Sequence, residues 1–255
     1  MPDKYLIANW KMNLPPEGVD AYLTALAAAE KGATTLVIAP PFPYLREAAG
    51  RGALPVAGQN AAAEKSGAFT GEVSATMLRE CGASHVILGH SERRSLYGDS
   101  DEVVARKLAL AIESGLAPVF CIGEDLRTRD AGEVEPFLSS QLQAVAAAVE
   151  GTRQIIVAYE PIWAIGTGRN ASGAMVAETV AGIRAALARF WPAAIAENVS
   201  VLYGGSVTPD NVDDLVANGA IDGFLVGGAS LSSAKFLAIQ KALDAGAESG
   251  KNAQP

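Results

Sequence analysis

Glu160 is the residue of this sequence with the clearest potential for proton transfer. It follows a run of apolar and β-branched residues at 154–159 and directly precedes Pro161. Proline drives the preceding residue toward extended backbone, which restricts the position from which the Glu160 carboxylate emerges. A carboxylate held at the end of a buried strand is a candidate general base, and we predict this role for Glu160.

A second candidate for acid-base chemistry, His90, follows another apolar run at 86–88. Ser91 can cap a short helix that begins there, which would place His90 at a helix N-terminus. The partial positive charge at that end disfavours the imidazolium, so we expect a neutral ring that donates a hydrogen bond. A structural histidine is the alternative. His85 should face the opposite way on a regular strand, and we interpret it as structural.

Positive charge for an anionic ligand is supplied by Lys11. It stands two residues after Asn9, just beyond the first apolar run at 5–8. Residues two apart on a strand point the same way, so we expect the Asn9 amide and the Lys11 ammonium to converge on one ligand. Taken alone, this segment also fits a surface lysine beside a turn asparagine.

The segment after Glu160 has an unusual composition for a loop. Residues 162–165 form an apolar tip, bracketed by the rigid Pro161 on one side and by Gly166 and Gly168 on the other. This pattern predicts a lid that closes over a bound ligand and excludes water. A loop that packs on a neighbouring helix is the alternative.

Two glycine-rich turns follow the last two apolar runs. They read Gly204-Gly205-Ser206 and Gly227-Gly228-Ala229-Ser230. Such turns bring backbone N–H groups close to an anion, and α/β barrels commonly bind phosphate after strands seven and eight. Plain tight turns are the alternative. The sequence contains no dinucleotide-binding fingerprint, no Walker loop and no cluster of histidines and carboxylates, so we predict no cofactor and no metal site.

All these residues lie at or near the ends of eight short apolar runs, which are the candidate strands. The runs are 5–8, 35–39, 55–57, 86–88, 118–122, 154–159, 199–203 and 223–226. Several are continuously apolar, as expected where a parallel sheet is covered on both faces. Ala-rich stretches with helical spacing separate them, including 19–30, 101–114, 134–150 and 174–190. This alternation predicts the α/β class and a closed (β/α)8 barrel of eight parallel strands, with a doubly wound open sheet as the alternative.

The whole chain is expected to form one domain. Its 255 residues, 49% of them hydrophobic, are enough for one sizeable core. No shift in composition marks an internal boundary, so we predict a single domain over residues 1–255, with a frayed polar tail from about residue 245. Near the C-terminus, Thr208 as a cap and Pro209 in the first turn predict a helix that stops at Gly219.

Charge and cysteine content exclude several functional classes. The formal net charge is −8 and the isoelectric point is near 4.9, so no basic surface for nucleic acid or for an acidic membrane is indicated. Cys81 and Cys121 suggest neither a disulfide framework nor a zinc site. The N-terminus lacks the pattern of a signal peptide, and no apolar run reaches the ~18 residues of a membrane span. We therefore predict a cytoplasmic protein without nucleic-acid or membrane partners.

Five segments, read together, resemble the motifs of the triosephosphate isomerase family. They are Asn9-Trp10-Lys11-Met12-Asn13, Gly89-His90-Ser91-Glu92-Arg93-Arg94, Tyr159-Glu160-Pro161-Ile162-Trp163-Ala164-Ile165-Gly166-Thr167-Gly168, Tyr203-Gly204-Gly205-Ser206 and Val226-Gly227-Gly228-Ala229. The resemblance extends from about Lys4 to about Asp244. It implies a TIM barrel that interconverts dihydroxyacetone phosphate and D-glyceraldehyde 3-phosphate through an enediolate, in glycolysis and gluconeogenesis and without a cofactor.

The resemblance also implies a role for each candidate residue. Glu160 would be the base, His90 would polarise the carbonyl, and Lys11 would stabilise the charge that develops on oxygen. Asn9 and Lys11 would contact the substrate. The residues that would hold its phosphate are Gly166, Ser206, Gly227 and Gly228.

The loop that begins at Gln59 and ends at Glu72 resembles the dimer loop of the family and implies a homodimer, with Thr70 near the partner's catalytic residues. Ala62 and Ala63 stand there in place of bulkier residues.

Two other functions stay open. A phosphate-dependent barrel lyase or epimerase would need metal ligands or a Schiff-base lysine on a middle strand. A non-catalytic phosphosugar-binding barrel or dimeric scaffold would have a broken base or lid.

Overall fold

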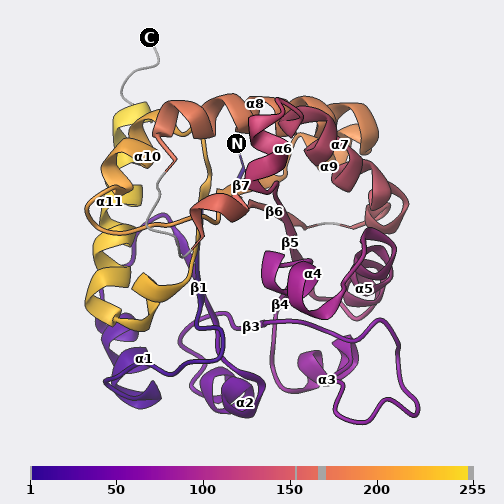
Figure 1. The fold of residues 1–255 in the computed structure, drawn as a ribbon. Coiled ribbons are helices and arrows are strands. Elements are labelled where there is room, and N and C mark those ends of the chain that lie inside the picture. Colours follow the sequence, from indigo (N-terminus) through magenta and orange to yellow (C-terminus); the bar gives the residue numbers. More distant parts are fainter. Residues whose placement is uncertain (1, 153, 166–170, 252–255) are drawn as a thin grey trace.

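The fold is an eight-stranded parallel barrel surrounded by helices (Figure 1). The computed structural model describes residues 2–152, 154–165 and 171–251, with the side chains of 247–251 left aside. Within this part of the chain the strands are β1 Tyr5–Asn9, β2 Thr35–Ala39, β3 Ala57–Gly58, β4 His85–Leu88, β5 Ala117–Ile122, β6 Ile156–Tyr159, β7 Ser200–Tyr203 and β8 Gly223–Val226. Their order in the sheet is β2-β1-β8-β7-β6-β5-β4-β3.

The sheet closes on itself between β2 and β3. Ile38 forms a parallel bridge with Val56, and the Ile38 N–H donates to the Pro55 carbonyl at 3.0 Å. Strand β1 already pairs with β8 on its other side, with Tyr5 opposite Gly223. The predicted barrel is therefore confirmed, and the doubly wound open sheet is excluded.

Helices follow the strands around the outside of the barrel (Figure 1). In the described residues the α-helices are α1 Val19–Ala28, α2 Phe42–Gly50, α3 Ala75–Glu80, α4 Ser91–Tyr97, α5 Asp101–Glu113, α6 Leu126–Asp130, α7 Val134–Ala144, α8 Gly173–Phe190, α9 Ala193–Ala196, α10 Val212–Asn218 and α11 Ser233–Lys251. The short 3-10 helices in the same residues are η1 Ala146–Val149, η2 Ile162–Ala164 and η3 Gly228–Leu231.

Several helix boundaries differ from the sequence prediction, and α1 ends at Ala28 rather than at 30. The stretch 134–150 divides into α7 and η1, with Val145 between them in a non-helical conformation. Helix α10 begins later than expected, because Asn211 and not Thr208 occupies its N-cap. The predicted stop at Gly219 is observed.

Apolar side chains fill both faces of the sheet, as the continuous apolar runs indicated. On β1, Tyr5 and Ile7 belong to the cluster inside the barrel, whereas Leu6 and Ala8 pack in the larger cluster between strands and helices. Burial on both faces is typical of parallel sheets covered by helices. The barrel interior is therefore a packed core, which leaves the carboxyl ends of the strands as the place for a site.

The C-terminal helix α11 closes the ring against the start of β2. Asp244 Oδ1 accepts hydrogen bonds from the Thr34 N–H at 3.0 Å and from the Thr34 hydroxyl at 2.6 Å. The helix continues to Lys251, so the first part of the predicted polar tail is helical, and residues 252–255 lie outside the described part. In the described residues, no helix has the length and apolar character to cross a membrane.

Candidate active site

The backbone of Glu160 is fixed at the end of β6, between Gly123 after β5 and Gly204 after β7. Its N–H donates to the Ile122 carbonyl at 2.7 Å. A side chain at Gly123 would overlap the Glu160 carbonyl oxygen, and a Cβ at Gly204 would come within 2.9 Å of Glu160 Cγ. These glycines leave room for Glu160, whose residue surface is only 1% exposed.

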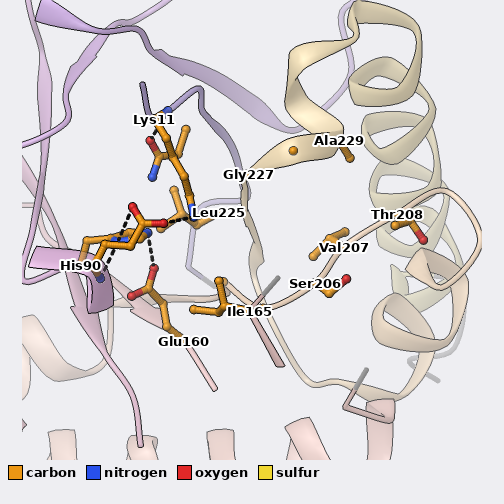
Figure 2. A pocket seen from close by; sticks show the side chains of 15 residues that line it. Lys11, His90, Glu160, Ile165, Ser206, Val207, Thr208, Leu225, Gly227 and Ala229 are labelled. Carbon is orange, nitrogen blue, oxygen red and sulfur yellow. Dashed lines mark hydrogen bonds and ion pairs between the residues drawn. The ribbon is translucent and has the colours of Figure 1, made fainter. Parts of the chain in front are cut away.

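Both carboxylate oxygens of Glu160 have neighbours on the segment that follows β4. Oε1 lies 3.0 Å from His90 Nε2, and Oε2 accepts a hydrogen bond from the Ser91 N–H at 2.8 Å. The His90 contact is close but lacks the alignment of a hydrogen bond. Figure 2 shows the two side chains pointing toward one another at the edge of the pocket. The structure thus brings together the predicted base and the predicted electrophile.

The tautomer of His90 follows from its position as the N-cap of α4. The Glu92 N–H donates to His90 Nδ1 at 3.2 Å, so Nδ1 is an acceptor. In the neutral ring the proton then lies on Nε2, the nitrogen that faces Glu160 and the pocket. Gly89, with a φ of 73°, breaks the regular strand just before His90. Strand alternation therefore does not determine the direction of this ring.

Lys11 occupies a turn rather than the strand that precedes it. Its φ of 52° lies in the left-handed region, its N–H donates to Asn9 Oδ1 at 3.1 Å, and its carbonyl accepts from Gln59 Nε2 at 2.9 Å. Asn9 and Lys11 line the same pocket, as predicted, but through this turn and not through strand alternation. The Lys11 ammonium is 2.6 Å from Glu92 Oε1, an ion pair that sequence reasoning missed.

Ser206 of the first glycine turn and Gly227 of the second lie across the pocket from Glu160 and His90 (Figure 2), whereas Gly204 packs against Glu160. The second turn is held by Ser230, whose N–H and hydroxyl donate to the Gly227 carbonyl at 2.8 and 2.6 Å. A Cβ at Gly227 would lie 3.5 Å from Lys11 Cε, so the lysine stem passes beside this turn. An accessible glycine backbone beside the positively charged Lys11 side chain is suited to binding an anion.

Together these groups enclose a cavity of about 390 Å³. It is lined by Asn9, Lys11, His90, Glu92, Glu160, Ile165, Gly204, Gly205, Ser206, Val207, Thr208, Leu225, Gly227, Gly228 and Ala229. Every predicted site residue that the structure describes is in this group, and Gly166 lies outside the described residues. Their roles stay predictions.

The segment predicted to start a lid is anchored to a buried carboxylate. Glu124 is fully buried, and its Oε1 accepts hydrogen bonds from Trp163 Nε1 at 2.9 Å and from the Tyr159 hydroxyl at 3.1 Å. Arg129 Nε binds the same oxygen at 2.8 Å. Trp163 thus packs against polar partners instead of forming part of a purely apolar tip, whereas Ile165 lines the pocket. The glycines at 166 and 168 fall outside the described residues.

Sequence reasoning missed Glu92, Val207, Thr208 and Leu225 among the pocket residues. Glu92 had a usable signal, because it stands two residues after His90 in a short helix that begins at the strand end. Val207 and Thr208 lie on a loop whose path the sequence does not specify, and Leu225 lies on β8, in a run predicted only as a strand.

Other chemistries find little support in the described residues. There, no group of three or more histidine, cysteine, aspartate or glutamate side chains is placed to hold a metal ion. None of the eight described strands contains a lysine, which a Schiff-base mechanism on a middle strand would need. Cys121 is buried beside the site, where burial and then the nearby Glu160 carboxylate raise its pKa well above the ordinary range. It is therefore not a ready nucleophile.

Comparison with known proteins gives one consistent result. A family model described as triosephosphate isomerase matches residues 4–243. The triosephosphate isomerase of Alcanivorax borkumensis is 47% identical over 245 residues, which cover 92% of this chain and 96% of the relative. The enzyme of Cupriavidus necator is 46% identical over 247 residues, covering 95% and 100%. That of Hydrogenovibrio crunogenus is 41% identical over 250 residues, covering 95% and 98%.

Proposed function

Because this chain belongs to the triosephosphate isomerase family, we propose that Glu160, His90 and Lys11 carry out its reaction. That reaction is the interconversion of dihydroxyacetone phosphate and D-glyceraldehyde 3-phosphate, a step of glycolysis and gluconeogenesis. The observation that carries the assignment is the 3.0 Å approach of His90 Nε2 to Glu160 Oε1 in a cavity that Lys11 also lines.

The chemistry requires that a proton leave the carbon beside a carbonyl and return to the neighbouring carbon. Glu160 acts as the base: its carboxylate takes the proton from one carbon and delivers it to the other. To reach the substrate, the carboxylate must first break its hydrogen bond with the Ser91 N–H, which donates to Oε2 at 2.8 Å. Since Glu160 is almost fully buried, few water molecules hydrate its carboxylate in place of the substrate.

Negative charge develops on the substrate oxygens while the enediolate forms. His90 donates its Nε2 proton as a hydrogen bond to this charge, and the ammonium of Lys11 stabilises it electrostatically. Both groups are set before the substrate arrives, His90 by the Glu92 N–H and Lys11 by its ion pair with Glu92. Preorganised donors of this kind need little rearrangement in the transition state.

The phosphate group is bound by the two glycine turns, through Ser206, Gly227 and Gly228, and by Gly166 of the lid. Asn9, whose side-chain oxygen holds the Lys11 N–H, contributes a polar wall beside the ammonium. The hydrogen bond from Trp163 to Glu124 anchors the start of the lid, so closure over the substrate can begin from a defined position.

We further propose that two chains form a homodimer through the loop that starts at Gln59. Beside the main cavity lies a hollow of about 210 Å³. Its lining includes Lys11, His90, Met12 and Tyr97, and the last two are 95% and 67% exposed. Large exposed apolar side chains next to catalytic groups fit coverage by a partner loop, with Thr70 of the partner subunit reaching toward the site. Sedimentation should then give about twice the 26.3 kDa of one chain.

We also propose that the protein forms a single domain and is located in the cytoplasm. The barrel occupies the described chain from Tyr5 to helix α11, and the two cysteines, Cys81 and Cys121, are free thiols. Free thiols are typical of a reducing compartment.

A coupled assay on the purified full-length protein tests the proposed function. We expect rapid conversion of D-glyceraldehyde 3-phosphate, and in heavy water we expect deuterium on the carbon that receives the proton, because a carboxylate base exchanges its proton with solvent. A folded protein that binds inorganic phosphate but gives no turnover would overturn the proposal in favour of a phosphosugar-binding barrel.

A further inference from the structure

Asn211 immediately precedes α10, yet its side chain does not cap that helix. Asparagine at an N-cap usually accepts a hydrogen bond from the second or third N–H of the helix. Here the side chain makes no such bond. It turns back toward the preceding loop, which contains Ser206, Val207 and Thr208.

The Asn211 amide holds this loop at two points. The Thr208 N–H donates to Asn211 Oδ1 at 2.8 Å, and Asn211 Nδ2 donates to the Ser206 carbonyl at 3.0 Å. One partner is a donor and the other an acceptor, so together they determine the orientation of the amide. The Asn211 N–H also donates to the Thr208 carbonyl at 3.2 Å, which closes the turn from its main-chain side.

The clamped loop forms one wall of the cavity opposite Glu160 (Figure 2). Val207 is 5% exposed and packs in the core, which anchors the middle of the loop. In the described part of the chain, the backbone N–H groups of Ser206 and Val207 have no protein acceptor. These N–H groups are held in a fixed turn beside a cavity that Lys11 also lines, and such an arrangement can bind an anion.

We propose that Asn211 is a positioning residue for the phosphate group of the substrate. It touches neither substrate nor reacting atoms; it fixes the Ser206–Thr208 loop in the conformation that presents its N–H groups. Without the Asn211 amide, the loop would become ordered only when the ligand binds. The entropy lost in ordering the loop would then reduce the affinity for the ligand. The inference rests on the proposed function, because it assumes that Ser206 belongs to the phosphate site.

The test compares Asn211→Ala with Asn218→Ala, which removes an amide at the other end of α10 that, within the described residues, donates to Asp214. Wild-type and variant proteins are assayed for KM and kcat with D-glyceraldehyde 3-phosphate. Their dissociation constants for inorganic phosphate are measured by calorimetry. If Asn211→Ala does not fold, Asn211→Ser replaces it, because serine keeps the N-cap preference but is too short to hold both partners.

For the Asn211 variants we expect KM and the phosphate dissociation constant to rise about tenfold, with a smaller change in kcat. Asn218→Ala should keep all three values within about twofold of the wild type. Unchanged KM and phosphate affinity in a folded Asn211 variant would overturn the inference, and so would an equal effect in the Asn218 control. A wild-type protein without turnover would instead contradict the proposed function, and phosphate affinity would still report on Asn211.

Discussion

His90 Nε2 lies 3.0 Å from Glu160 Oε1, while the Ser91 N–H holds the other oxygen of the same carboxylate at 2.8 Å. The carboxylate of the proposed base is thus flanked on two sides by consecutive residues at the start of α4. Its reach into the cavity depends on the length of its side chain, because the backbone is fixed between Gly123 and Gly204. With Glu160 as the proposed base, we expect the reaction to be sensitive to a change of one methylene in this side chain.

We expect Glu160→Asp to lower kcat on the order of 100-fold or more, because it withdraws the carboxylate from the substrate carbon while keeping its charge. Steady-state kinetics with D-glyceraldehyde 3-phosphate measure the effect, and circular dichroism checks the fold. Glu150→Asp makes the same change on an exposed side chain and should leave kcat unchanged. Turnover of Glu160→Asp within twofold of the wild type would remove this residue from the role of base.

Most of the fold follows from the sequence, because parallel strands buried on both faces give continuous apolar runs. Details that depend on local geometry do not. The third strand is Ala57–Gly58 rather than 55–57, and its closure with β2 relies on the Pro55 carbonyl and Val56 just outside it. A bridge of this kind, made between short segments, leaves no periodic pattern in the sequence.

The candidate site was predictable to the extent that it lies at strand ends. The positions of Lys11 and His90 were found, but strand alternation does not explain the directions of their side chains, since each depends on a left-handed backbone position at Lys11 or Gly89. The ion pair between Lys11 and Glu92 joins residues 81 positions apart. No local rule connects such residues, so only the folded barrel reveals the contact.

We expect Lys11→Met to lower kcat/KM on the order of 100-fold or more and to weaken the binding of a phosphorylated inhibitor. Methionine keeps an unbranched chain but removes the charge and leaves Glu92 without its partner at 2.6 Å. The same substitution at the exposed Lys235, on α11, is the control.

The double variant Lys11→Met with Glu92→Gln separates two causes of this loss. If the unpaired Glu92 carboxylate repelled the substrate, removing its charge would restore activity. We expect no recovery, because in the proposed mechanism the ammonium group of Lys11 stabilises the developing oxyanion. Near-normal kinetics of either Lys11 variant would show that this charge is not needed.

Gly204→Ala should lower kcat about tenfold or more, because the new Cβ would come within 2.9 Å of Glu160 Cγ and displace the carboxylate. The backbone of Gly204 is not left-handed, so the effect would come from this contact and not from backbone strain. Gly50→Ala, where a Cβ meets nothing within 4 Å, is the matched control. A crystal structure of the variant with Glu160 unmoved and activity retained would contradict the argument.

His85 should make the stability of the protein depend on pH. It begins β4, is 6% exposed, packs against the Tyr5 ring and has Nδ1 2.8 Å from the Ser84 hydroxyl. Its Nε2 has no partner in the described residues. Burial lowers the pKa of His85 to about 4, from an ordinary value of about 6.5 in an unfolded chain.

Between these two pKa values the unfolded chain binds more protons at this position than the folded protein, so stability rises with pH. The contribution of neutral His85 is complete above about pH 6.5 and is lost as pH falls toward 4. At pH 4.5 the loss relative to pH 7 is about 2–3 kcal/mol. In His85→Gln, the fall in the free energy of unfolding between these pH values should be smaller by that amount. Urea titrations at fixed protein concentration measure the free energy of unfolding. The contributions of other groups that titrate in acid are shared by both proteins and cancel in the comparison. An equal fall in the two proteins would show that His85 is not responsible.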